Sequence, residues 1–116
     1  MIRISREELV NRWARTYGED GYQVRAAHVL GLALPEPVGP FMPDIEATKH
    51  GNRILVYVID SPEALEAPRT RRQLQALDAA RGSDTRLHLV VAAECMSGLK
   101  DRMEQWSIRA DAVHVT

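Results

Sequence analysis

Apolar and polar positions along the chain predict an alternation of helices and strands. The first helix begins at Ser5, which together with Glu8 fits a capping box. Beyond it, apolar residues recur at helical spacing until Gly18, at Leu9, Val10, Trp13, Ala14 and Tyr17. Residues 22–30 then alternate in the manner of a strand, with Tyr22, Val24, Ala26 and His28 on one face.

The middle of the chain predicts a loop followed by two strands. Residues 31–43 hold four of the six prolines, which favours a loop over a helix. Residues 44–49 are short and extended in character, and His50-Gly51-Asn52 supplies the turn after them. Residues 53–60 are nearly all apolar or β-branched, which is typical of a central strand covered on both faces.

The last third of the chain predicts alternating helices and strands. Ser61-Pro62-Glu63 breaks the preceding strand, and Pro68 suits a first helical position. Residues 86–93 predict another buried strand, Ser97 a helix cap and residues 112–115 a short closing strand. The predicted order is α-β-β-β-α-β-α-β, which indicates an α/β domain with a mixed sheet flanked by helices.

The composition fits one domain that spans residues 1–116. The chain has 45% hydrophobic and 27% charged residues, enough apolar material for one core. No apolar run reaches the roughly 20 residues that a membrane-spanning helix needs, and the charged start lacks the features of a secretory signal. Cys95 is the single cysteine, so we expect no internal disulfide, a reducing cytoplasmic location and no membrane partner.

Pro43-Asp44 opens the second strand of a predicted hairpin unit, and a dense apolar strand follows it. With this element order, residues 5–93 resemble the PD-(D/E)XK nuclease superfamily. Its pattern is an Asp, often after Pro, and then an acidic-x-Lys triplet on the next strand. The resemblance implies a restriction-endonuclease-like αβββαβ core, to which this chain adds a C-terminal helix and strand.

The resemblance also implies a chemistry. Nucleases of this superfamily hold Mg²⁺ between carboxylates on adjacent strands, where the metal activates water and neutralises charge on the phosphate. It places Asp44 and Asp60 as the metal ligands of this chain. Mg²⁺ is therefore the expected cofactor if the chain is active, and no small-molecule cofactor is evident.

The segment matched to the triplet, Val58-Ile59-Asp60, departs from the pattern twice. Val58 stands at the position of the second carboxylate, and Asp60 stands at the position of the lysine. A replacement carboxylate has two expected sources. Glu46 shares a strand face with Asp44 by alternation, and Glu63 or Glu66 folds back from the following segment.

A cluster of basic residues marks the start of the helix after that strand. Arg69, Arg71 and Arg72 carry positive charge near a helix N-terminus, which opposes the helix dipole and indicates a contact with phosphate. Gln73 echoes a glutamine in the Q-x-x-x-Tyr pattern of one branch of the superfamily, but Leu77 occupies the Tyr position. A solvated helix residue is the preferred interpretation of Gln73. The net charge of −1 argues against binding nucleic acid by bulk electrostatics.

Three hypotheses about function follow. The first is a catalytically impaired nuclease-like protein that binds nucleic acid or a protein partner. The second is an active Mg²⁺-dependent nuclease with a site rebuilt from Asp44, Asp60 and Glu46 or Glu63. The third is a structural or regulatory protein without a nucleic-acid role. A homodimer is expected because a minimal domain of this kind has exposed strand edges. Trp13 and Trp106 are expected in the core.

Overall fold

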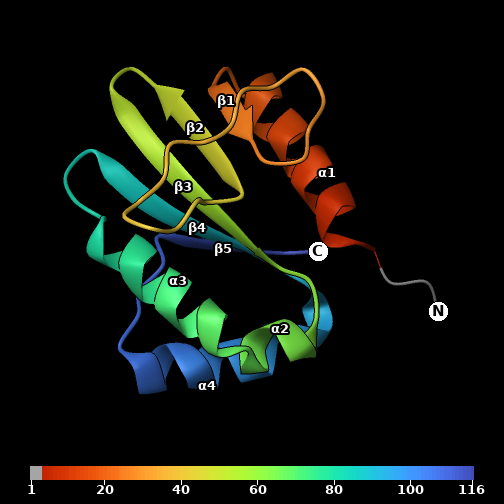
Figure 1. Ribbon diagram of the computed structural model, residues 1–116, viewed down its shortest axis with the longest axis vertical. Coiled ribbons are helices and arrows are strands. Elements are labelled where there is room, and N and C mark those ends of the chain that lie inside the picture. Colours follow the sequence, from red (N-terminus) through yellow and green to blue (C-terminus); the bar gives the residue numbers. More distant parts are fainter. Residues whose placement is uncertain (1–3) are drawn as a thin grey trace.

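The computed structural model describes residues 4–116, so the first three residues of the expected 1–116 domain lie outside the described residues. The chain forms, in order, α1 (Arg6–Glu19), β1 (Gln23–Ala26), β2 (Ile45–Lys49), β3 (Asn52–Ile59), α2 (Pro62–Glu66), α3 (Pro68–Ala79), β4 (Thr85–Val91), a short 3₁₀ turn (Ala93–Cys95), α4 (Met96–Trp106) and β5 (Ala112–Val115) (Figure 1).

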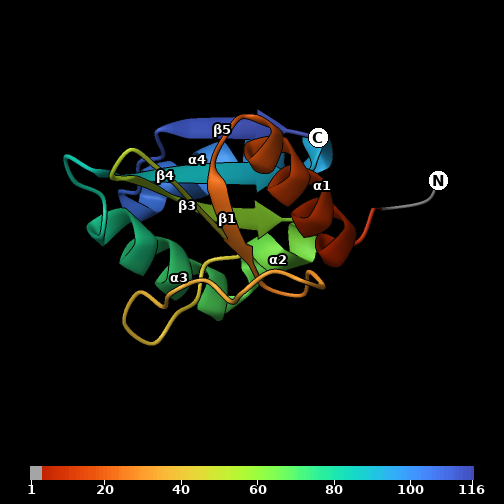
Figure 2. The ribbon, with the colours of Figure 1, turned by 90° about the horizontal axis from the view of Figure 1, so that it is seen from above.

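The five strands form one mixed sheet in the order β1-β2-β3-β4-β5. β1 pairs with β2 and β2 with β3 in antiparallel fashion, whereas β3–β4 and β4–β5 are parallel. Parallel neighbours need a long crossover, and α2 with α3 supplies it between β3 and β4. Figure 2 shows β5 at one edge of the sheet with β4 and β3 beside it. The predicted α/β class with a mixed sheet flanked by helices is confirmed.

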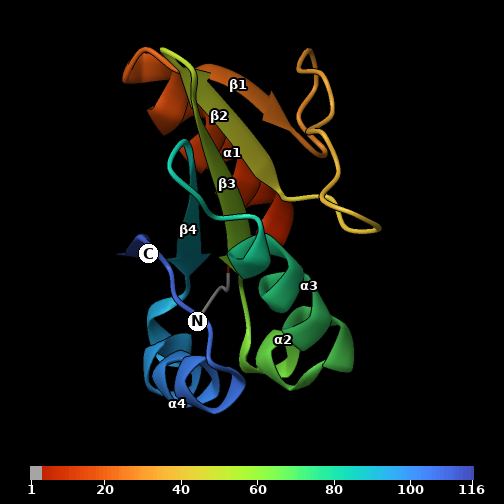
Figure 3. The same cartoon turned by 90° about the vertical axis from the view of Figure 1, so that its left-hand side faces the viewer.

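Helices cover the two faces of the sheet unequally. Leu9, Val10 and Ala14 of α1 pack with Val56 and Val58 on one face. On the other face, residues of α2, α3 and α4 surround the remaining side chains of β3, namely Leu55, Tyr57 and Ile59. Figures 1 and 3 show α1 apart from the other helices, with the sheet between them. The prediction that this strand is covered on both faces is therefore confirmed.

Local sequence explains where α1 begins. The Ser5 hydroxyl accepts a hydrogen bond from the backbone N–H of Glu8 at 3.2 Å, as the capping pattern predicts. The apolar stripe that follows buries Leu9, Val10, Ala14 and Tyr17 against the sheet. Burial of this stripe fixes the orientation of the helix, and its first residue, Arg6, is thereby directed to the start of β2.

Two predicted boundaries were wrong, and one short helix was missed. The first strand ends at Ala26 rather than Leu30, because its partner β2 begins only at Ile45, which pairs with Ala26. The segment after β3 forms a separate helix, α2, whose cap is the Ser61 hydroxyl bound to the N–H of Ala64. Ser97 lies inside α4 rather than capping it. Among residues 4–116, no helix has the length and apolar character that crossing a membrane requires.

Candidate functional site

Asp44 is the residue immediately before β2, and the pairing of β2 with β3 sets its direction. Ile45 lies opposite Val56, and the backbone N–H of Asp44 donates to the carbonyl of Val56 at 2.9 Å. The paired register ends at Ile45, so Asp44 has no paired residue on β3. Its side chain lines the same cavity as Tyr57 of β3 and Thr70 and Gln73 of α3, so the side chains of Asp44 and Tyr57 lie on the α3 side of the sheet.

The side chains of β3 divide between the two faces of the sheet. Val58 packs on the α1 face, whereas Tyr57 and Ile59 pack on the face of α2 and α3, where Tyr57 lines the same cavity as Asp44. Val58, which the resemblance matches to the family's second carboxylate, therefore does not share a face with Asp44. Neither Tyr57 nor Ile59 offers a carboxylate or an amine beside it.

A short turn could have revealed the register of β2 and β3. Lys49 pairs with Asn52, so His50 and Gly51 alone form the turn, with positive φ angles of 51° and 80°. Two positive φ angles in a two-residue hairpin are typical of a type I′ turn. Counting outward from that turn puts Glu46 opposite Leu55 and Ile45 opposite Val56, so Leu55 and Tyr57 share the face of Glu46, and Val56 and Val58 lie on the other face.

Arg6 binds the Asp44 carboxylate from the start of α1. Its Nε lies 3.2 Å from Oδ1, and its Nη2 lies 3.0 Å from Oδ1 and 2.8 Å from Oδ2. The backbone N–H of Val58 donates to Oδ2 at 2.7 Å. Both carboxylate oxygens of Asp44 therefore accept hydrogen bonds, although only 7% of the residue is exposed. This is the hydrogen-bonding pattern of an ionised carboxylate.

Burial and the neighbouring opposite charge have opposite effects on the pKa values of Asp44 and Arg6. Burial raises the pKa of Asp44, and the charge of Arg6 together with the Val58 N–H opposes that rise. Burial alone would lower the pKa of Arg6, but the Asp44 carboxylate and Tyr57 outweigh it, so that pKa is raised. Arg6 is therefore firmly charged, and the ionised state of Asp44 depends on it.

Tyr57 and Gln73 lie beside Arg6 and Asp44 and extend this cluster of polar side chains. The Tyr57 hydroxyl donates to Oε1 of Gln73, and the Arg6 guanidinium lies 4.9 Å from the centre of the Tyr57 ring. Gln73 is buried on α3, so its interpretation as a solvated helix residue was wrong. Its hydrogen bond ties α3 to β3 beside Asp44.

These side chains line an open cavity of about 470 Å³ between the sheet, α1 and the start of α3. Its polar lining comprises Arg6, His28, Asp44, Tyr57, Arg69, Thr70 and Gln73. Two arginines face one carboxylate there, so these three groups give the cavity a net positive charge. Such a lining offers hydrogen-bond donors to an anion.

Glu46 was expected as a replacement carboxylate on the Asp44 face. It lies opposite Leu55 on that face, but its carboxylate accepts from Nε of Arg53 and from the backbone N–H of Glu36 at 3.1 Å. It lines a different cavity, of about 570 Å³. Glu46 therefore binds Arg53 and the Glu36 backbone in another cavity and does not join Asp44.

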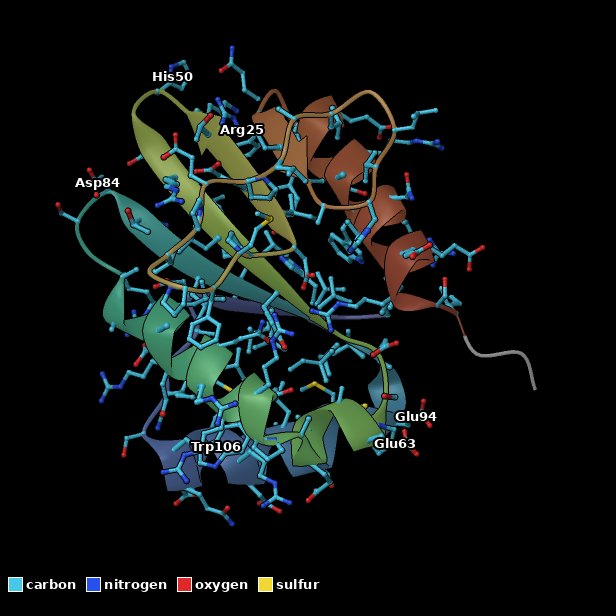
Figure 4. The ribbon with its side chains drawn as sticks, viewed as in Figure 1. Arg25, His50, Glu63, Asp84, Glu94 and Trp106 are labelled. Atoms are coloured by element: carbon cyan, nitrogen blue, oxygen red, sulfur yellow. The ribbon has the colours of Figure 1, made fainter. Side chains whose placement is uncertain are left out.

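The other expected acidic residues also lie elsewhere. Asp60 follows the last residue of β3 and is half-buried, but it does not line the Asp44 cavity. Glu63 is exposed on α2 (Figure 4), and Glu66 pairs with Arg102 of α4. Within residues 4–116, no three His, Cys, Asp or Glu side chains gather where they could hold a metal. Both oxygens of Asp44 accept hydrogen bonds from Arg6, and Asp60 lies outside this cavity, so the two expected ligands do not present a joint set of oxygens to Mg²⁺.

The three predicted arginines of α3 point to two different places. Arg69 lines the Asp44 cavity. Arg71 and Arg72 line a second hollow, of about 480 Å³, between α3 and α4. Ala67 lines both hollows, so the two adjoin at the start of α3.

The chain was compared with protein families, curated proteins and solved structures. The chain has no significant match among protein-family models, curated proteins or solved structures. Its function is therefore inferred from its own residues and their geometry.

Proposed function

We propose that this chain is a catalytically inactive, nuclease-like protein that binds nucleic acid without a metal ion. The observation that carries the proposal is the contact between Arg6 and Asp44. The guanidinium holds the carboxylate that the resemblance assigns to Mg²⁺. The order α1-β1-β2-β3-α2-α3-β4, with two antiparallel pairs and one parallel pair, is compatible with a restriction-endonuclease-like core in which two helices occupy the place of one.

Arg6 supplies a fixed positive charge, as a metal ion would, but it cannot activate water. A metal ion lowers the pKa of bound water and so generates a nucleophile, which a guanidinium cannot do. Tyr57 and Ile59 offer neither the carboxylate nor the amine that would complete the site. The lack of these groups favours binding without hydrolysis over a nuclease whose carboxylates have been rearranged.

A phosphate group fits the chemistry of the cavity. The bonds from Arg6 to Asp44 use Nε and Nη2, and Nη1 takes no part in them. Arg69 is exposed at the wall of the same cavity. Guanidinium groups bind phosphate oxygens through paired hydrogen bonds. A backbone phosphate of nucleic acid therefore lies between Arg6 and Arg69 in this proposal.

A binding titration tests the proposal. Fluorescence anisotropy of labelled single- and double-stranded DNA and RNA is measured in EDTA, with the parent chain, Arg69→Gln and the exposed control Arg86→Gln. We expect binding in EDTA that weakens with salt, and a log–log salt slope reduced by about one in Arg69→Gln alone. Failure of the parent chain to bind any of these probes at low salt would refute the proposal.

A further inference from the structure

The hollow between α3 and α4, here called the α3–α4 groove, combines three arginines with a tryptophan. It is bordered by Arg71, Arg72 and Gln75 of α3 and by Arg102 and Trp106 of α4. Trp106, at the α4 side of the groove, is labelled in Figure 4. The volume of about 480 Å³ lies within the range of small-molecule sites.

Positive charge is concentrated in this groove. Three arginines line it against a single acid, Glu66, in a chain whose net charge is −1. Arg102 is held by its ion pair with Glu66. Arg71 and Arg72 are exposed, and within residues 4–116 neither makes an ion pair or side-chain hydrogen bond. The groove thus has two arginines available to a ligand and a third fixed in place.

The start of α3 adds to this positive potential. Its N-cap is Ala67, which supplies no capping hydrogen bond, and no acidic residue lies in the first turn. Arg71 and Arg72 are the fourth and fifth residues of the helix, close to this uncapped end. Their positive charges and the positive end of the helix dipole therefore both favour an anion bound at the start of α3.

Trp106 favours a ligand that carries an aromatic base as well as a negative charge. It packs partly against the core but remains half-exposed where it lines the groove. An aromatic side chain beside arginines matches a nucleotide, whose base stacks on the ring while its phosphate binds the guanidinium groups. An acidic peptide would satisfy the arginines and leave the indole surface unused.

We propose that the α3–α4 groove binds one nucleotide unit of single-stranded nucleic acid, with the base on Trp106 and the phosphate on Arg71 and Arg72. This inference rests on the proposed function, because it adds a second contact to that of the Asp44 cavity. The two hollows adjoin at Ala67, so one strand crosses the start of α3 and occupies both.

The neighbouring arginines supply matched variants for the test. Binding of a labelled dT8 oligonucleotide is followed by anisotropy and by quenching of tryptophan fluorescence, in the parent chain, Arg71→Gln/Arg72→Gln, Arg69→Gln and Trp106→Phe. Circular dichroism and Tm establish that each variant is folded. Oligoglutamate serves as the competing acidic peptide.

We expect Arg71→Gln/Arg72→Gln to lose affinity about tenfold or more together with the quenching, and Trp106→Phe to lose most of the quenching. If Arg69→Gln weakens binding while Arg71→Gln/Arg72→Gln binds as the parent does, the groove is refuted and the Asp44 contact stands. If instead Arg71→Gln/Arg72→Gln weakens binding while Arg69→Gln binds as the parent does, the groove is supported and the proposed phosphate contact at the Asp44 cavity is refuted. Displacement of dT8 by oligoglutamate at equal charge concentration would also refute the nucleotide site, and failure of the parent to bind refutes both proposals.

Discussion

The guanidinium of Arg6 and the carboxylate of Asp44 meet across 38 positions of sequence. The contact joins the first turn of α1 to the residue that opens β2, and it lies where the resemblance to nucleases implies a metal. It has two consequences. It stabilises a buried carboxylate without a metal, and it places a permanent positive charge at the wall of the Asp44 cavity.

Removing one member of this pair is predicted to destabilise the fold. In Arg6→Met, Asp44 keeps its Val58 N–H bond but loses its counter-charge. Breaking a buried pair costs about 3–5 kcal/mol. Because the Arg6 side chain is partly exposed, we expect the free energy of unfolding to fall by about 3 kcal/mol. Urea unfolding at neutral pH measures the loss. Adding Asp44→Asn to Arg6→Met is expected to recover part of it, and a double variant no more stable than Arg6→Met would contradict this account of the pair.

Lowering the pH is predicted to destabilise the protein through His88 and His114. Nδ1 of His88 lies 2.6 Å from the Tyr17 hydroxyl, and burial lowers the pKa of both histidines. The unfolded chain then binds more protons, so stability is full above the unfolded pKa of about 6.5 and falls as the pH drops toward the folded values. The slope is at most about 1.4 kcal/mol per pH unit for each histidine.

Unfolding free energies measured from pH 5 to 8 test this dependence. His88→Gln keeps an acceptor for Tyr17 and removes the titration, so the slope below pH 6.5 should decrease. An unchanged slope in His88→Gln would show that His88 is not responsible.

The bond between Tyr57 and Gln73 is predicted to show coupling in a double-mutant cycle. Tyr57→Phe removes the hydroxyl and should cost about 1 kcal/mol. Gln73→Leu leaves that hydroxyl without its partner in a buried position and should cost more, about 1–3 kcal/mol. The double variant should be less destabilised than the sum of the two losses, and strict additivity would mean that the bond does not contribute.

Gly51 is predicted to be sensitive to substitution because of its backbone angle. Its φ is 80°, in the left-handed region, although nothing lies within 4 Å of an added Cβ. Gly51→Ala should therefore lose about 1 kcal/mol from backbone strain alone. Gly82 also has open space but no positive φ, so Gly82→Ala should change the unfolding free energy little. Equal losses in the two variants would contradict this assignment.

Much of the fold could be predicted from local sequence. The Ser5 cap, the stripe of Leu9 and Val10, and the dense apolar run of β3 are features of single segments. The break at Ser61-Pro62 was predicted, but the short helix α2 was missed because only five residues form it. The order of the elements followed from these segments, and the sheet pairing agrees with it.

The candidate site was less predictable, because it depends on contacts between distant segments. No spacing in the sequence indicates that Arg6 binds Asp44. The position of Tyr57 depended on the length of the turn at His50 and Gly51, and a one-residue change in register exchanges the two faces of a strand. Gln73 was assigned to solvent because polar helix residues are usually exposed, whereas its hydrogen bond to Tyr57 compensates its burial.

The central claim is that the Asp44 site binds nucleic acid without a metal ion and does not cleave it. The most direct measurement follows the binding and the integrity of labelled DNA and RNA in EDTA, in Mg²⁺ and in Mn²⁺, with Asp44→Ala beside the parent chain. We predict binding that does not require a metal, is strongest in EDTA and weakens in Mg²⁺ or Mn²⁺ through competition of these cations for phosphate, with intact nucleic acid throughout. Cleavage that requires Mg²⁺ or Mn²⁺ and disappears in Asp44→Ala would contradict it.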